Sequence, residues 1–154
     1  MTTSLSLRAV SAEETRPIRQ RVLRPGFPSS ASHYGGDEFA EAAHFGVYQG
    51  ETLLAVGTVV PEVCKDLNGD AAMKSEGAWR LRGMATLPEA RSKGCGAMIL
   101  RACLEHAGNH GARLVWCNAR TGALSFYLRH GFVKMSEEYV MPGIGPHFLM
   151  KHEF

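Results

Sequence analysis

A short glycine-rich segment has the residue types most suggestive of chemistry. It reads Arg91-Ser92-Lys93-Gly94-Cys95-Gly96-Ala97, and an apolar pattern of helical period follows it. A glycine-rich turn that enters a helix presents free backbone N–H groups and the positive end of the helix dipole, which favour bound phosphate. The segment therefore predicts a pyrophosphate site. A turn whose glycines serve only to reverse the chain is the simpler alternative.

Two common phosphate-binding loops do not match this turn. A Walker loop requires Lys followed by Ser or Thr after its last glycine, and no such pair occurs here. A dinucleotide-binding fingerprint requires a third glycine where this sequence has Ile99. The remaining pattern is Arg-x-x-Gly-x-Gly followed by a small residue and an apolar helix.

A second segment lies further along the chain. Asn118 precedes the string Ala123-Leu124-Ser125-Phe126-Tyr127-Leu128-Arg129-His130-Gly131-Phe132. Together with the glycine-rich turn, this N…A-x-x-F-Y-x-x-x-G-F pattern resembles the GNAT acetyltransferases (the Gcn5-related N-acetyltransferase superfamily), in particular small bacterial-type members. The resemblance runs along nearly the whole chain. It implies an α/β (α+β) GNAT fold: a mixed, mostly antiparallel twisted sheet of about seven strands with helices on both faces.

The resemblance also implies a donor site for acetyl-CoA. The donor would lie where the strand at 79–87 splays from the strand at 114–118, and its pantetheine arm would pair with the first of these strands. The pyrophosphate would lie on the turn, where a Cβ at either glycine would push the phosphates away. The implied cofactor-binding residues are Met84, Ala85, Thr86, Arg91, Ser92, Lys93, Gly94, Cys95, Gly96, Ala97, Asn118 and Phe126. For Asn118, capping of the next helix is nearly as good an interpretation.

Tyr127 resembles the tyrosine that protonates the departing thiolate of CoA in many family members. A phenol is neutral at pH 7 and can donate a proton. A structural tyrosine in the core is the alternative. The carboxylate that many members carry before the pyrophosphate turn is missing, because Arg80 and Leu81 occupy the matching positions. Glu76, Glu38 and His44 are the candidate bases, and the sequence favours none of them.

The acceptor is expected to be a primary amine of a small molecule, peptide or protein. Arg82, Arg120 and His44 are the candidate substrate residues, and a cationic Arg82 or Arg120 would suit an amine that carries a carboxylate. The alternative, which the sequence slightly favours, is that Arg80, Arg82 and Arg120 pair with internal glutamates. No histidine is placed by sequence to activate Cys95 or Cys117, so direct attack by the amine is preferred over an acetyl-cysteine intermediate. A catalytically silent acyl-CoA-binding module is the competing function.

The elements that must position these residues follow from periodicity and turn signals. Ser11 and Glu14 predict a capped helix that continues to Val22 or Leu23, and Asp37 predicts a short capped helix that ends at Ala43. The other predicted elements are strands at 5–10, 44–48, 52–60, 79–87, 114–117, 132–141 and 148–152, and helices from 96 to about 108 and from 123 to 129.

Length and charge limit the remaining possibilities. The chain has 154 residues and a net charge of +2, which predicts a single domain over residues 1–154 and no nucleic-acid partner. The sequence from Met1 to Arg8 lacks the pattern of a signal peptide, so we expect a cytoplasmic protein with reduced cysteines, no metal and no membrane contact. Segment 133–150, with Pro-Gly-Ile-Gly-Pro, is expected to shape either the acceptor site or a homodimer contact. The chain has 17 glycines, more than the usual share of about 7%, and most of them are assigned to turns.

Overall fold

The computed structural model describes residues 4–154, so the part of the signal-peptide prediction that concerns residues 1–3 lies outside the described residues. The strands are β1 (Leu5–Ala9), β2 (Ala43–Gln49), β3 (Thr52–Pro61), β4 (Ala78–Thr86), β5 (Leu114–Arg120), β6 (Val133–Lys134), β7 (Tyr139–Met141) and β8 (Gly145–Glu153). The helices are α1 (Ala12–Ile18), α2 (Cys95–Asn109) and α3 (Leu124–Arg129). Short helical turns are η1 (Arg19–Leu23, a π-helix), η2 (Ser29–Ser32), η3 (Pro88–Ala90) and η4 (Thr121–Ala123).

The eight strands follow the order β1-β2-β3-β4-β5-β8-β6, and β7 pairs with β8. The sheet is mixed and mostly antiparallel, as predicted, but has one strand more than expected. The predicted strand at 132–141 is two short strands, β6 and β7, because the chain leaves the ladder between them. There the Ser136 hydroxyl oxygen accepts a hydrogen bond from the Leu149 N–H at 2.9 Å, which occupies a backbone donor of β8.

The described chain forms two compact units. Among the described residues, the first contains residues 4–60 and Leu81–His106, and the second contains Pro61–Arg80 and Ala107–Phe154. The boundaries therefore cut through β4 and α2. The prediction of a single domain over the whole chain stays a prediction.

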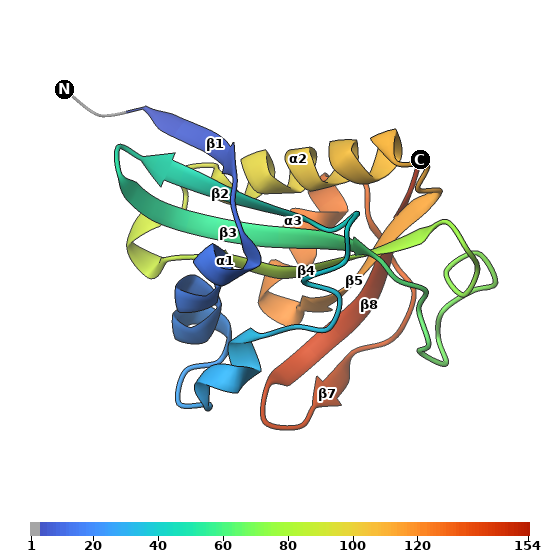
Figure 1. The fold of residues 1–154 in the computed structure, drawn as a ribbon. Helices are drawn as coiled ribbons and strands as arrows, with labels where there is room; N and C mark the ends of the chain where they lie inside the picture. The colour runs from blue at the N-terminus through green and yellow to red at the C-terminus, as the bar shows by residue number, and fades with distance from the viewer. Residues whose placement is uncertain (1–3) are drawn as a thin grey trace. The chain divides into compact units, whose positions relative to one another are not determined.

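In the first unit, β1, β2 and β3 form an antiparallel ladder (Figure 1). Helix α2 covers one face of it, since a Cβ added at Gly57 would lie 2.5 Å from Cγ2 of Ile99. The opposite face receives η1, because Thr58 bonds Arg19. Two adjacent residues of β3 thus face different helical segments, as alternation along a strand requires.

The α1 region confirms one sequence prediction and corrects another. Ser11 and Glu14 form the predicted capping box, with hydrogen bonds of 3.0 and 3.1 Å. The predicted helix from Asp37 to Ala43 is wrong, because this segment consists of turns before β2 begins. The Asp37 carboxylate accepts from the Tyr34 N–H and from Arg19 instead of capping a following helix.

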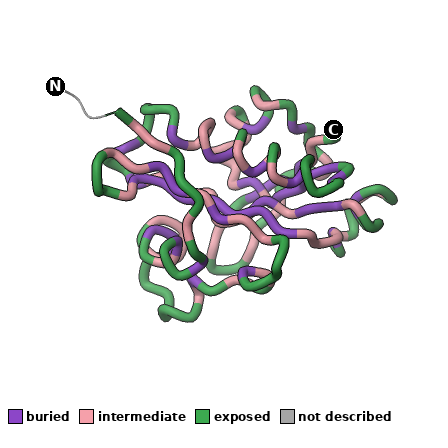
Figure 2. The backbone as a smooth tube through the Cα atoms, turned by 45° about the horizontal axis from the view of Figure 1, so that its top comes forward, coloured by how far each residue is buried: buried purple, intermediate pink, exposed green. Residues whose placement is uncertain are grey.

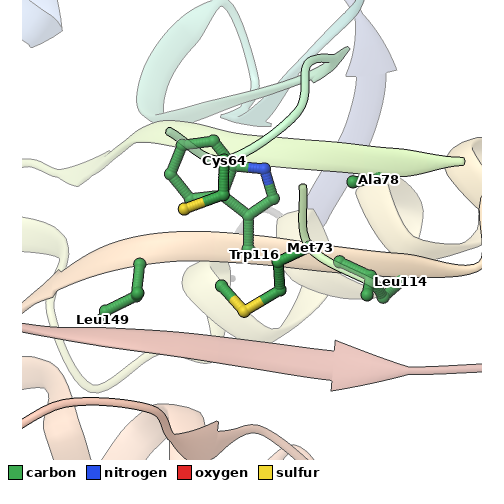
Figure 3. Close-up of a cluster of buried hydrophobic side chains, with 6 residues drawn as sticks. All are labelled: Cys64, Met73, Ala78, Leu114, Trp116 and Leu149. Atoms are coloured by element: carbon green, nitrogen blue, oxygen red, sulfur yellow. The ribbon is translucent and has the colours of Figure 1, made fainter. Parts of the chain in front are cut away.

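In the second unit, the first three residues of β4 pair in parallel with β5, and β5 pairs along its whole length with β8. A buried cluster fills this unit (Figure 3), and its members are Cys64, Met73, Ala78, Leu114, Trp116 and Leu149. Trp116 satisfies its indole N–H by donating to the Glu62 carbonyl at 2.8 Å. The polar segment before β4 is therefore held in place although it has no regular structure.

Burial follows the strands, and the connecting turns are exposed (Figure 2). In β4, Trp79, Leu81 and Ala85 are buried, whereas Arg80, Arg82 and Thr86 are half-buried. Within residues 4–154, no helix combines the length and apolar character that crossing a membrane would require.

Candidate functional site

The glycine-rich turn is an exposed connection into the N-terminus of α2. Arg91, Ser92, Lys93 and Gly94 are all exposed, and α2 begins at Cys95. Ser92 and Gly94 both have positive φ values, 68° and 86°. Residues of left-handed conformation alternating with right-handed ones turn successive N–H groups to one side, which creates an anion-binding concavity. The first N–H groups of a helix also lack intrahelical acceptors, so the turn has the donors that a pyrophosphate needs.

The glycine at position 94 is required by backbone conformation. No atom lies within 4 Å of a Cβ added there, but φ is +86°. Within the protein itself, the demand for glycine is therefore conformational rather than steric. Gly96 and Ala97 lie in the first turn of α2, and both are half-buried.

Two side chains of the turn are engaged inside the first unit. Lys93 donates to the Gln49 side-chain oxygen at 3.4 Å. Cys95 is buried, and this burial raises the pKa of its thiol. Any contact of Cys95 with a cofactor would therefore be made by its backbone N–H.

The second half of β4 carries Met84, Ala85 and Thr86 directly after Gly83. Gly83 has φ +67°, which is the conformation of a glycine in a β-bulge. The Ala85 side chain is buried, whereas Met84 and Thr86 are half-buried. Met84 points toward β3, where its sulfur would lie 2.5 Å from a Cβ at Gly57. A ligand pairing with this stretch would use backbone groups, as the resemblance implies.

The two arginines that share a face of β4 have different contacts. Arg80 donates to Glu62 at 3.0 Å and lies over the Trp116 ring at 4.8 Å, so it has the internal glutamate partner that the sequence left open. The Arg82 guanidinium lies over the Tyr34 ring, 4.2 Å from its centroid.

A buried polar network lies beside Tyr34. Arg19 is completely buried, and its guanidinium pairs with both Asp37 oxygens at 2.8 and 3.0 Å. It also donates to Thr58 at 2.8 Å. Burial alone would raise the pKa of Asp37, but hydrogen bonds from Arg19 and the Tyr34 N–H, with the Arg19 charge, lower it. Asp37 is therefore a structural carboxylate and not a base.

His44 belongs to this network. Its Nε2 donates to the Asp37 carbonyl at 3.0 Å, because a carbonyl can only accept, and its Nδ1 contacts the Thr58 hydroxyl at 2.7 Å. Both ring nitrogens are thus used within the first unit. Glu38 and Glu76 are exposed, and Glu38 lies 3.5 Å from Arg16. None of the three candidate bases has the geometry of a preorganised base.

Tyr127 lies on α3 in the second unit and is buried, with 6% of its surface exposed. Its ring packs edge-on against Phe126 and Phe132, with centroids 5.1 and 5.2 Å apart. Phe126 also packs on His130, whose Nδ1 donates to the Phe126 carbonyl. The motif thus forms an aromatic group that fixes the Tyr127 ring.

Asn118 is held by a residue that the sequence did not single out. The Tyr139 hydroxyl donates to Asn118 Oδ1 at 2.5 Å. Burial raises the pKa of Tyr139 to about 12, with further contributions from Asp66 and Cys117, so its hydroxyl stays protonated. The Asn118 oxygen therefore accepts one hydrogen bond within the second unit, and its amide N–H groups would be the donors offered to a ligand.

The end of β5 lies beside the Pro-Gly-Ile-Gly-Pro loop. Arg120 is half-buried and stands opposite His147 of β8. His147 is buried, stacks on Tyr139 and contacts the Gly145 carbonyl through Nδ1 at 2.8 Å. A carbonyl accepts only, so the Nδ1 carries the proton. The sequence feature that pointed to the region of Arg120, Tyr139 and His147 is the Pro-Gly-Ile-Gly-Pro string.

The remaining thiols are poorly suited to nucleophilic chemistry. Burial raises the pKa of Cys117 to about 12 and also raises that of Cys103. Among residues 4–154, no group of His, Cys, Asp and Glu side chains has the arrangement of a metal site.

Comparison with known proteins supplies the family. A family model described as an acetyltransferase (GNAT) domain matches residues 42–154. The chain is 31% identical over 146 residues to the uncharacterized N-acetyltransferase YitI of Bacillus subtilis, covering 95% of this chain and 94% of that protein.

Two solved structures show the same fold. Escherichia coli ElaA has a TM-score of 0.74 at 18% identity, over 97% of this chain and all of that chain. FeeM, an N-acyl amino acid synthase from uncultured soil microbes, has a TM-score of 0.75 at 17% identity, over 99% of this chain and 92% of that chain. The family match and the 31% identity together place this chain in the GNAT family of acyltransferases, which use an acyl-CoA as co-substrate.

Proposed function

We propose that the protein transfers an acetyl group from acetyl-CoA to a primary amine. The observation that carries this proposal is the exposed turn before α2, where Ser92 and Gly94 adopt positive φ values and the first N–H groups of the helix have no intrahelical acceptors. The pyrophosphate and pantetheine of the donor are assigned to the first unit, to residues 91–97 and 84–86. Asn118, Phe126 and Tyr127 are assigned to the second unit.

The reaction is proposed to be direct. The neutral amine nitrogen attacks the thioester carbon, the C–S bond breaks, and the thiolate of CoA takes a proton from the Tyr127 hydroxyl. The proton that the amine loses passes to solvent, and the Tyr127 phenolate regains a proton from solvent. Support for this route over an acetyl-cysteine comes from Cys95 and Cys117, which are buried and have raised pKa values that keep them as thiols at neutral pH.

Tyr127→Phe tests the assignment of the proton donor. We expect turnover to fall by about 10²-fold, the lower end of general acid catalysis, with acetyl-CoA affinity unchanged within about twofold. Turnover is measured by thiol release across a panel of primary amines, and affinity by calorimetry. Tyr48→Phe is the matched control, because that hydroxyl bonds Glu14 in the first unit.

Two results would contradict the proposal. Full turnover of Tyr127→Phe would remove the assigned proton donor. Binding of acetyl-CoA without thiol release on any amine would favour a catalytically silent acyl-CoA-binding module. Faster release from a longer acyl-CoA would retain the acyltransferase and change the donor.

A further inference from the structure

In the second unit, the Tyr139 side chain reaches Asn118 across an intervening strand. Asn118 of β5 stands opposite Leu149 of β8. Tyr139 of β7 stands opposite His147, two residues earlier on β8. Residues two apart on a strand, and residues directly paired across strands, have their side chains on the same face of a sheet. All four side chains therefore lie on one face, and the Tyr139 hydroxyl crosses β8 to lie 2.5 Å from Asn118 Oδ1.

Packing fixes the position of the Tyr139 ring. The ring stacks on His147, with centroids 6.2 Å apart and 25° between the two planes. It also packs against the buried hydrophobic cluster of the second unit. Burial is the main cause that raises the pKa of Tyr139 to about 12, so its hydroxyl keeps its proton at neutral pH. The phenol thus presents a fixed O–H donor to Asn118.

This contact decides which end of the Asn118 amide faces a ligand. A separation of 2.5 Å lies in the range of O–H···O bonds and below that of N–H···O bonds, so the amide oxygen faces the phenol. The terminal torsion of an asparagine is broad and roughly two-fold, so an amide without an anchor turns readily. With its oxygen bonded to Tyr139, the two N–H groups of Asn118 point the other way. Asn118 is half-buried, so part of its side chain is open to a ligand.

A second hydrogen bond joins the same two parts of the chain. The Thr121 hydroxyl, directly after β5, donates to the Glu138 carboxylate at 2.8 Å, and Glu138 directly precedes β7. The pairing of β7 with β8 attaches this segment as well. The segment is therefore held independently of the Tyr139 hydroxyl. The effect specific to that hydroxyl is the orientation of the Asn118 amide.

We infer that Tyr139 is a positioning residue for the acyl-CoA: its hydroxyl orients the Asn118 amide so that the N–H groups donate to a carbonyl oxygen of the pantetheine arm. This inference rests on the proposed function, which assigns Asn118 to the cofactor. A carbonyl oxygen accepts hydrogen bonds and cannot donate them, so only the nitrogen end of the amide matches it. An amide turned the other way would set two oxygens against each other. Tyr139 therefore contributes by preorganising the site before the cofactor binds.

Tyr139→Phe tests the inference, because it removes the hydroxyl and keeps the ring on His147. Binding of acetyl-CoA and of ADP is measured by calorimetry, since ADP has the adenosine and pyrophosphate of CoA but no pantetheine arm. We expect Kd for acetyl-CoA to rise about fivefold, the value of one hydrogen bond, with Kd for ADP unchanged within about twofold. Urea unfolding verifies that the variant is folded.

A double-mutant cycle separates orientation of the amide from support of the fold. Asn118→Ala should raise Kd for acetyl-CoA by a similar factor. Tyr139→Phe added to Asn118→Ala should cause no further loss, because the hydroxyl then has no amide to orient.

Asn118→Asp is the second test variant, and it keeps the inference testable if Tyr139→Phe does not fold. Its carboxylate still accepts from the Tyr139 hydroxyl but offers no N–H group. Kd for acetyl-CoA should therefore rise by about fivefold or more although the contact with Tyr139 is kept. Unchanged binding of acetyl-CoA by Asn118→Asp would overturn the inference.

Thr121→Val is the matched control. It removes the hydroxyl bond to Glu138, which ties the same two parts of the chain together without touching Asn118. Kd for acetyl-CoA should stay at the wild-type value. An equal loss in Thr121→Val and Tyr139→Phe would mean that both bonds merely support the segment, and would overturn the positioning role.

The inference and the proposed function fail in different ways. Unchanged acetyl-CoA binding by Tyr139→Phe, an equal loss on ADP, or additive losses in the double variant would overturn the positioning role alone. A loss in Tyr139→Phe that is confined to acetyl-CoA, combined with no thiol release by the wild type on any amine, would retain the positioning role and refute the transferase. Absence of acetyl-CoA binding by the wild type would overturn both.

Discussion

Replacement of Asp37 by Asn tests whether the buried network in the first unit stabilises the fold. The Arg19 and Asp37 side chains are 0% and 3% exposed, and Arg19 makes four hydrogen bonds to Asp37, Ser32 and Thr58. Asp37→Asn leaves the guanidinium charge buried without its counter-charge. Breaking a buried pair from one side costs about 3–5 kcal/mol, and we expect about 3 kcal/mol because an amide oxygen still accepts one bond.

The measurement is urea unfolding at pH 7, followed by far-ultraviolet circular dichroism. Tryptophan fluorescence is the wrong probe, because Trp79 and Trp116 both belong to the second unit. Hydrogen exchange of β3 amides, measured by mass spectrometry, reports on the first unit directly. Glu89→Gln is the control: its partner is Arg21, both side chains are more than half exposed, and no measurable change is expected.

The pH dependence of the unfolding free energy independently checks whether the ionised Asp37 carboxylate stabilises the fold. The folded-state pKa of Asp37 lies below its ordinary value of 3.8, so its contribution is present above the unfolded pKa and is lost as pH falls through the folded pKa. The stability difference between wild type and Asp37→Asn should therefore shrink between about pH 4 and the onset of acid unfolding. A variant as stable as wild type at pH 7, or a difference that grows on acidification, would refute the reasoning.

Three further predictions follow from single sites. Gly94→Ala and Gly111→Ala impose the same backbone strain, at φ +86° and +82° and with open space around the Cβ, so both variants should lose about 1 kcal/mol of unfolding free energy in urea. Calorimetry should show weaker CoA binding only for Gly94→Ala. Equal CoA binding by the two variants would contradict the role of the turn. Gly57→Ala should cost about 1–3 kcal/mol of unfolding free energy, because its Cβ overlaps Ile99 and the Met84 sulfur at 2.5 Å. Cys117, with its pKa raised to about 12, should react with iodoacetamide at pH 7 only after denaturation; rapid alkylation of the folded protein, detected by mass spectrometry, would reopen acetyl-cysteine chemistry.

Where neighbouring residues supply both the pattern and its cause, the sequence predicts the structure well. The Ser11–Glu14 capping box and the helix after the glycine-rich turn both depend on contacts within a few residues. The two family signatures are equally local, and they sufficed for the fold class. The predicted helix after Asp37 failed because its cap residue is claimed by Arg19, 18 positions earlier.

By itself, then, the sequence determined the fold class, most of the strands and helices and the turn that we assign to the pyrophosphate of the donor, because these depend on local periodicity and backbone propensity. Only the tertiary structure decided the partners of the charged and polar residues. In the structure, Arg80 forms an ion pair with Glu62 and Arg82 lies over the Tyr34 ring, although both arginines share one face of β4. It also placed Tyr139 on Asn118. Such partners lie many residues apart, and the chain path that brings them together is set by packing of the whole core, which no local pattern encodes.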